Sequence, residues 1–239
     1  MRWLEKRAIL LLVLLTMVIA VANTAFGAPI GTGPISIVGS ENGTENKTAE
    51  TLTAQAGNVT NINIDSKTIT DYWTGFYGDV TGTISLENTA GNVFYNWSLA
   101  TPSGEVYATR GSSVTWASVN CSPAARAEAE DTAVGMTQAD TDSVNKTFYR
   151  GGNHSAFSIG GGTTFTADMC DYRTNAYDST GAQITNFDQI MLNDSTSAVY
   201  TTIIQDEQAG FDAGNYDFEL LVPSTISGET YYFYVEITT

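Results

Sequence analysis

Side chains able to perform covalent chemistry are few in this chain of 239 residues, which contains two cysteines and one histidine. A nucleophile such as serine needs an adjacent base, yet His154 lies in a polar Gly-Gly-Asn-His-Ser segment, where we expect a solvated loop histidine. The sequence has no G-x-S-x-G motif, and the glycine run at 160–162 lacks the lysine of a phosphate-binding loop. We therefore predict no catalytic residues and no enzymatic activity.

Carboxylates are the most abundant reactive groups, because 26 acidic residues outnumber 10 basic ones and give a net charge of −16. This balance excludes nucleic acid as a partner, since counterion release requires Lys and Arg. No acidic pair stands out as that of a glycosidase. Calcium, which prefers oxygen ligands, is the one candidate cofactor, a structural ion held by some of Asp140, Asp142, Asp168, Asp171, Asp206, Glu207 and Asp212.

The two cysteines, Cys121 and Cys170, are predicted to form one disulfide, because an even pair in an exported protein meets an oxidising compartment. Closing a loop of this length stabilises the fold by about 4 kcal/mol through chain entropy. The alternative is a pair of buried free thiols. A zinc site is a poorer interpretation, because there is no C-x-x-C motif and only one histidine.

Acceptor sequons for N-linked glycan are frequent, which predicts a glycoprotein with at least two occupied sites. Asn96 lies beside Trp97 in a strand-like run, so it must face outward if it is modified. The sites in polar segments are the best candidates, namely Asn42, Asn46, Asn145, Asn153 and Asn193. The eight sequons begin at Asn42, Asn46, Asn58, Asn96, Asn120, Asn145, Asn153 and Asn193.

Residues 1–22 have the pattern of a secretory signal peptide. Arg2, Lys6 and Arg7 precede an apolar run at 8–22, which is shorter than the ~20 residues of a membrane span. The small residues at 20–22 predict cleavage after Ala22, with Gly27 as a second site. The alternative is a pilin-type signal cut near Arg7, which would retain the apolar helix. We expect a secreted, cell-surface protein with no stable membrane span after processing.

The elements that must position these residues are mostly short strands separated by turns, which predicts an all-β fold: a β-sandwich, jelly-roll or immunoglobulin-like, over residues 58–239. The clearest hairpin joins 80–86 to 93–99, further strands are expected at 147–149, 198–204, 216–222 and 230–237, and one short helix at 124–134. The Cys-Trp-Cys spacing of an immunoglobulin domain is absent. Residues 28–57 form an extended N-terminal arm.

Aromatic residues gather in two places. The Trp-Thr-Gly-Phe-Tyr-Gly stretch at 73–78 is either an exposed platform for sugar rings or part of the core or an interface. The Tyr-Tyr-Phe-Tyr run at 231–234 faces both sides of its strand, so one face must be exposed or covered by a partner.

Two stretches carry a resemblance to known proteins: Ala56–Ile64 with Tyr72–Ile84, and Tyr216–Pro223 with Thr230–Glu236. They resemble a group of uncharacterised secreted archaeal surface proteins over about residues 55–239, and the resemblance implies no catalytic residues. The order of signal peptide, loose N-terminal segment and β-domain is also similar to subunits of archaeal bundling pili and bacterial biofilm fibres, which polymerise by donating a strand.

These features lead to the hypothesis of a glycosylated, non-enzymatic structural protein that binds copies of itself in a cell-surface filament, or pilus, by strand addition. The short apolar run of the arm is the candidate donor strand, through Ile35, Ile37 and Val38. The alternatives for the arm are a glycosylated spacer or pairing with its own domain. The alternatives for the protein are a monomeric carbohydrate-binding or adhesive module and an extracellular hydrolase.

Overall fold

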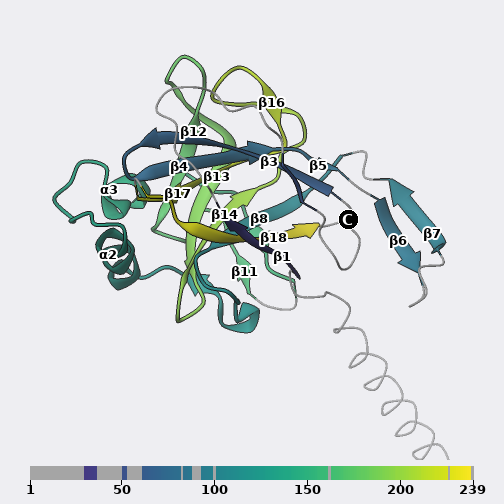
Figure 1. Cartoon of the computed structure of the whole chain (residues 1–239), viewed down its shortest axis with the longest axis horizontal. Helices are drawn as coiled ribbons and strands as arrows, with labels where there is room; N and C mark the ends of the chain where they lie inside the picture. Colours follow the sequence, from purple (N-terminus) through teal and green to yellow (C-terminus); the bar gives the residue numbers. More distant parts are fainter. Residues whose placement is uncertain are drawn as a thin grey trace, which may run out of the picture.

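The structure is a computed structural model that describes residues 30–36, 50–52, 61–81, 83–87, 93–98, 101–160, 163–225 and 227–237 (Figure 1). The predicted signal peptide at 1–22 lies outside these residues, as does most of the 28–57 arm. Antiparallel strands dominate the described part, which confirms the prediction of a β-rich fold. No helix in that part is both long and apolar enough to cross a membrane.

The larger sheet of the described part has seven antiparallel strands in the order β1-β18-β8-β14-β13-β12, with β9 attached to β13. All residues of β8 are buried, as are the first five of β14, so these central strands carry core side chains on both faces. The strands are β1 (Ile30–Ser36), β8 (Gly104–Thr109), β9 (Asn120–Cys121), β12 (Arg173–Tyr177), β13 (Gln183–Asn193), β14 (Ala198–Ile203) and β18 (Thr230–Ile237).

The second sheet has the order β17-β4-β3-β2, and β5 pairs with β3. Phe76 and Leu220 of this sheet join Val106, Tyr200 and Phe233 of the larger sheet in the main hydrophobic cluster, so the two sheets face each other across it. Whether they form a jelly-roll or immunoglobulin-like sandwich stays a prediction. The strands are β2 (Glu50–Leu52), β3 (Asn61–Thr70), β4 (Trp73–Gly78), β5 (Val80–Thr81) and β17 (Phe218–Pro223).

A small hairpin covers the other face of the larger sheet. Its strands are β10 (Phe157–Ser158) and β11 (Thr164–Phe165), and the rings of Phe157 and Phe165 stack with centroids 4.7 Å apart. They belong to a second hydrophobic cluster that includes Tyr107, Ile190 and Val199 of the sheet. The larger sheet is therefore buried on both faces, which explains why its central strands are apolar on both sides.

Two further hairpins are β6 (Thr83–Glu87) with β7 (Val93–Ser98), and β15 (Gln208–Ala209) with β16 (Asn215–Tyr216). The first lies apart from the two large sheets in Figure 1 and confirms a hairpin within the predicted 80–86 and 93–99. The predicted first strand is divided, however, because Val80–Thr81 form β5, which pairs with β3. The three closing strands are confirmed as β14, β17 and β18.

The predicted helix is confirmed as α2 (Ala124–Ala133), which follows Pro123 in an alanine-rich stretch suited to helix. Its Glu130 is buried and accepts hydrogen bonds from Arg110 and from the Tyr200 hydroxyl, the latter at 3.1 Å. These bonds attach α2 to the ends of the sheet strands.

The prediction of a single helix, and of a strand at 147–149, is wrong, because Val144–Phe148 form a second short helix, α3. The Ser143 hydroxyl accepts the Lys146 amide at 3.2 Å, and the Asp131 carboxylate accepts the Val144 amide at 2.5 Å. Both bonds satisfy amides that a helix start leaves unpaired. Asp131 lies in α2, 13 positions before Val144, so the strand-like residue types at 147–149 did not reveal this contact.

Candidate assembly edge and its surroundings

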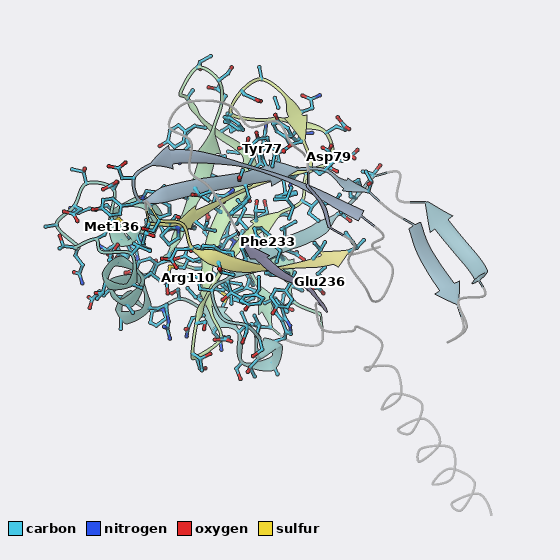
Figure 2. All side chains as sticks on the ribbon, in the orientation of Figure 1. Tyr77, Asp79, Arg110, Met136, Phe233 and Glu236 are labelled. Carbon is cyan, nitrogen blue, oxygen red and sulfur yellow. A yellow bond between two sulfur atoms is a disulfide. The ribbon has the colours of Figure 1, made fainter. Side chains whose placement is uncertain are left out.

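The C-terminal strand β18 is fixed on both faces by the chain itself. Phe233, which is labelled in Figure 2, packs edge-on against Phe76 on the side of the main core, with ring centroids 4.8 Å apart. On the opposite side, Tyr234 packs against Trp116 at 5.2 Å. The expectation that one face of the 231–234 run must be exposed or covered by a partner is wrong, because Phe233 on one face and Tyr234 on the other both pack against side chains of the same chain. Within its own sheet, β18 has β8 on one side and only β1 on the other.

Strand β1 occupies that remaining edge and pairs antiparallel with β18, from Ile30 opposite Val235 to Ser36 opposite Thr230 (Figure 1). The register shifts between Gly31 and Pro34, which marks a bulge. Proline cannot donate to a ladder and is confined to sheet edges. Glycine-rich strands specify their register weakly, which applies to β1 with its two glycines.

Of the three predicted donor-strand residues, only one lies in the described part of the chain. Ile35 lies in β1, opposite Tyr231, whereas Ile37 and Val38 lie outside the described residues. For Ile30–Ser36, the structure has the alternative arrangement, in which the arm pairs with its own domain.

The end strand of the second sheet, β17, is closed in a different way. The side-chain amide of Gln189 donates to the Glu219 carbonyl at 2.6 Å and accepts the Leu221 amide at 2.9 Å. Next to it, the Tyr231 hydroxyl donates to the Pro223 carbonyl at 2.5 Å. Sequence reasoning did not single out Gln189, although a glutamine within the apolar run of β13 was a signal.

The end strand of the larger sheet opposite to β1, β12, is closed by a neighbouring loop. The Gly151 amide donates to the Arg173 carbonyl at 2.9 Å, and Tyr149 forms a bridge with Tyr172. The Asn175 side chain accepts the Asn153 amide at 2.8 Å. These contacts join residues only 22 to 23 positions apart, so the backbone groups of β12 that they use are not open to a further strand.

Two carboxyl groups lie opposite each other on the neighbouring strands β8 and β18. Glu105 of β8 is the cross-strand partner of Glu236 of β18, and the Tyr107 hydroxyl donates to Glu236 at 3.1 Å. Burial, and then the Glu236 charge, raise the pKa of Glu105 to about 8. Burial also raises the pKa of Glu236. The pair therefore favours the protonated form of at least one carboxyl group.

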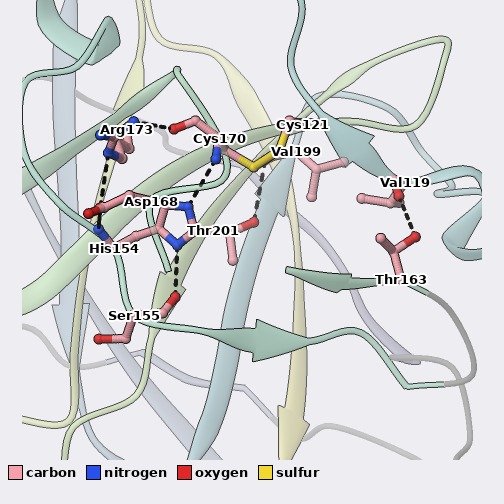
Figure 3. The surroundings of a disulfide bond; sticks show 10 residues. All are labelled: Val119, Cys121, His154, Ser155, Thr163, Asp168, Cys170, Arg173, Val199 and Thr201. Atoms are coloured by element: carbon pink, nitrogen blue, oxygen red, sulfur yellow. Dashed lines mark hydrogen bonds and ion pairs between the residues drawn. A yellow bond between two sulfur atoms is a disulfide. The ribbon is translucent and has the colours of Figure 1, made fainter. Parts of the chain in front are cut away.

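The predicted disulfide between Cys121 and Cys170 is confirmed (Figure 3). The prediction for His154 is wrong: it is only 2% exposed and lies beside this bond. Its Nδ1 donates to the Ser155 carbonyl at 2.7 Å, and its Nε2 accepts the Cys170 amide at 3.1 Å. The ring thus holds both ends of the segment that ends in Cys170, which is a structural role in place of a solvated one.

The sequons differ in how free their side chains are. Asn120 and Asn153 are exposed. Asn145 and Asn193 are half-buried, and their Oδ1 atoms accept hydrogen bonds from the Tyr172 hydroxyl and the Arg126 guanidinium, respectively, each at 2.9 Å. Asn96 lies in β7, opposite Ser85, and its side chain is not described; Asn42, Asn46 and Asn58 lie outside the described residues.

The acidic residues proposed for calcium do not converge. Arg150 pairs with Asp171 at 2.8 Å, Arg173 lies 3.3 Å from Asp168, and Asp212 accepts the Tyr216 hydroxyl at 2.9 Å. In the described ranges, no group of three or more His, Cys, Asp or Glu side chains could hold a metal ion.

No protein-family model matches the chain, and searches of the curated proteins and of the solved structures found no match either. The functional argument therefore rests on the molecule itself.

Proposed function

We propose that this protein is the subunit of an extracellular filament, in which β1 of one copy pairs with β18 of the next. The observation that carries this proposal is the contrast at the sheet ends: β12 and β17 are closed by side chains and a nearby loop, whereas β18 is closed by a strand. An edge closed by an interchangeable strand supports exchange between copies, because the same bonds form within one chain or between two.

The length of the chain between β1 and β2 allows this exchange. Residues 37–49 separate the two strands, and 13 residues reach at most about 45 Å when extended. A neighbouring subunit lies within that distance for a domain of this size. Exchange between only two copies would close as a dimer, so the proposed filament requires each copy to give its strand to one neighbour and to receive a strand from another, a head-to-tail contact that propagates.

The secreted, glycosylated state belongs to the same proposal. Asn120 and Asn153 are the described sequons best able to carry glycan, because both are exposed. The carbohydrate-binding alternative has less support, since Trp73 and Phe76 of the suggested sugar platform are only 3% and 2% exposed.

A cysteine pair placed across the two strands tests the exchange. Ser36 and Thr230 are register partners, so Ser36→Cys with Thr230→Cys should form a disulfide wherever β1 meets β18. In assembled material we expect a ladder of covalent multimers on non-reducing gels. Multimers absent from assembled filaments, with the new disulfide confined to single chains, would contradict strand exchange.

A matched control lies in the β10–β11 hairpin. Ser158 and Thr164 are also antiparallel register partners with exposed side chains, so Ser158→Cys with Thr164→Cys should link only within one chain. If the native protein instead forms no fibres and stays monomeric at the cell surface, the filament proposal is wrong.

A further inference from the structure

A cavity of about 650 Å³ lies at the closed end of the second sheet, away from the β1–β18 edge. Its wall is mostly apolar and includes Phe76, Tyr77, Phe211 and Leu221, with Tyr177 of β12 also lining it. This volume and lining are typical of sites for small organic molecules. Neither the filament proposal nor the fold requires the space to exist.

One carboxylate lies in this apolar wall. Glu219 is 7% exposed and lines the cavity, and its Oε1 accepts the Phe211 amide at 2.8 Å. No Lys or Arg in the described part of the chain forms an ion pair with it. A buried carboxylate without a counter-cation is costly, so the site is electrostatically suited to a ligand that brings a positive charge.

The neighbouring groups add to this preference. The rings of Phe211 and Tyr216 both pack against Tyr77, with centroids 4.8 Å from it. Aromatic faces attract organic cations, and the net charge of −16 draws cations toward the molecule.

We infer that this cavity binds a small organic ammonium ion with an apolar body, the ammonium group pairing with Glu219 and the body lying against Phe211, Tyr77 and Leu221.

Other charged groups face the same place. Asp212 and the Tyr216 hydroxyl lie near Glu219 on the β15–β16 side, the Tyr77 phenol lies on β4, and Lys146 lines the cavity from α3. Lys146 is exposed, so water screens its charge more than that of Glu219. Burial, with a contribution from Asp212, raises the pKa of Glu219 to about 7. The carboxylate is therefore mostly ionised above neutral pH, where cation binding should be strongest.

The test compares three probes of similar shape with the whole secreted protein, by calorimetry or NMR titration: 2-phenylethylammonium, neutral 2-phenylethanol and anionic 3-phenylpropanoate. Near pH 8 we expect the ammonium ion to bind about tenfold more tightly than the alcohol. Near pH 5 the preference should fall to about twofold, because Glu219 is protonated there. Glu219→Gln keeps the shape and should remove the preference at both pH values.

Two further variants locate the effect. Glu128→Gln removes one charge from the exposed face of α2 and should leave the preference unchanged. Ala176→Phe fills the cavity from β12 and should abolish binding of all three probes. Equal binding of the ammonium ion and the alcohol near pH 8, tighter binding of the anion, or no binding of any probe would each overturn the inference.

Discussion

Strand β17 is the end strand of the second sheet and β18 is next to the end of the larger sheet, and their outer edges are closed in different ways. The outward backbone amide and carbonyl groups of β17 form hydrogen bonds with the side chains of Gln189 and Tyr231, which belong to strands packed in the core. Those of β18 meet the backbone of β1, a strand with two glycines and a proline. Side-chain bonds from the core cannot be passed to another copy, whereas a tethered strand can. Under the proposed function, the edge of β18 is therefore the one suited to exchange between copies.

Removing β1 should have the largest effect on this contrast. A mature chain lacking residues 23–36 should no longer form fibres, because β18 would receive no strand from any copy. Adding a synthetic peptide spanning 28–38 should protect the β18 amides from hydrogen exchange without restoring fibres, because the peptide is not attached to a second domain. Electron microscopy and exchange mass spectrometry measure the two outcomes. Normal fibres from the truncated chain would show that β1 is not the donor.

Removing the side-chain bonds at the edge of β17 should lower the stability of the domain without preventing assembly. Gln189→Leu leaves a buried carbonyl at 219 and a partly buried amide at 221 without these partners, which costs about 3 kcal/mol of unfolding free energy. Denaturant unfolding of the monomeric domain measures this loss. Fibre formation under conditions where the variant is folded should remain normal.

Gln183→Leu is the matched control. Its side-chain amide donates to the Gly151 carbonyl at 2.7 Å from an exposed position, so water can replace that bond. We expect a change below about 0.5 kcal/mol. If both glutamine variants lose the same stability, the side-chain closure of β17 is not the reason that this edge is held.

Sequence reasoning could predict that most of the strands exist, but it could not predict how their edges are closed. Alternation and turn residues predicted the closing strands and the hairpin at 80–99, because these signals are local. The pairing of Ile30–Ser36 with the last strand, the bond of Gln189 to β17 and the burial of His154 join residues far apart in the chain. Nothing in residue type or spacing determines such pairings, so the edges could not be assigned.

The disulfide was accessible from composition and the predicted signal peptide, because two cysteines in a chain expected to be exported leave one pairing. His154 shows the limit of the same approach. Its polar neighbours Asn153 and Ser155 are exposed and indicate a loop, but the ring between them turns inward to bond with the Cys170 amide. The prediction that His154 is exposed came from its polar neighbours, whereas its burial results from the contacts of its own ring.

The smallest expected effect is a pH dependence that separates the two edges, because each has its own buried carboxyl group. Burial raises the pKa of Glu105, beside β18, to about 8 and that of Glu219, in β17, to about 7. A carboxyl group whose pKa is raised by folding stabilises the folded state fully below its unfolded pKa of about 4.5, and this stability is lost as the pH rises through the folded pKa. The folded domain should therefore lose stability between about pH 5 and pH 8.

For Glu105 we expect about 2 kcal/mol, less than the full shift implies, because Glu236 is half-exposed and water screens the pair. Glu105 and Glu236 pair across β8 and β18, and β18 is the strand that pairs with β1, so under the proposed exchange the temperature at which fibres dissociate should fall with rising pH in the native protein. Glu105→Gln should remove that fall, since an amide keeps the shape without the charge. Glu219→Gln should leave the pH dependence of fibre dissociation intact, and it should weaken the pH dependence of the unfolding free energy of the monomer. If Glu219→Gln instead removes the pH dependence of fibre dissociation, the second sheet also contributes to the contact between copies, and the functional contrast between β17 and β18 would be wrong.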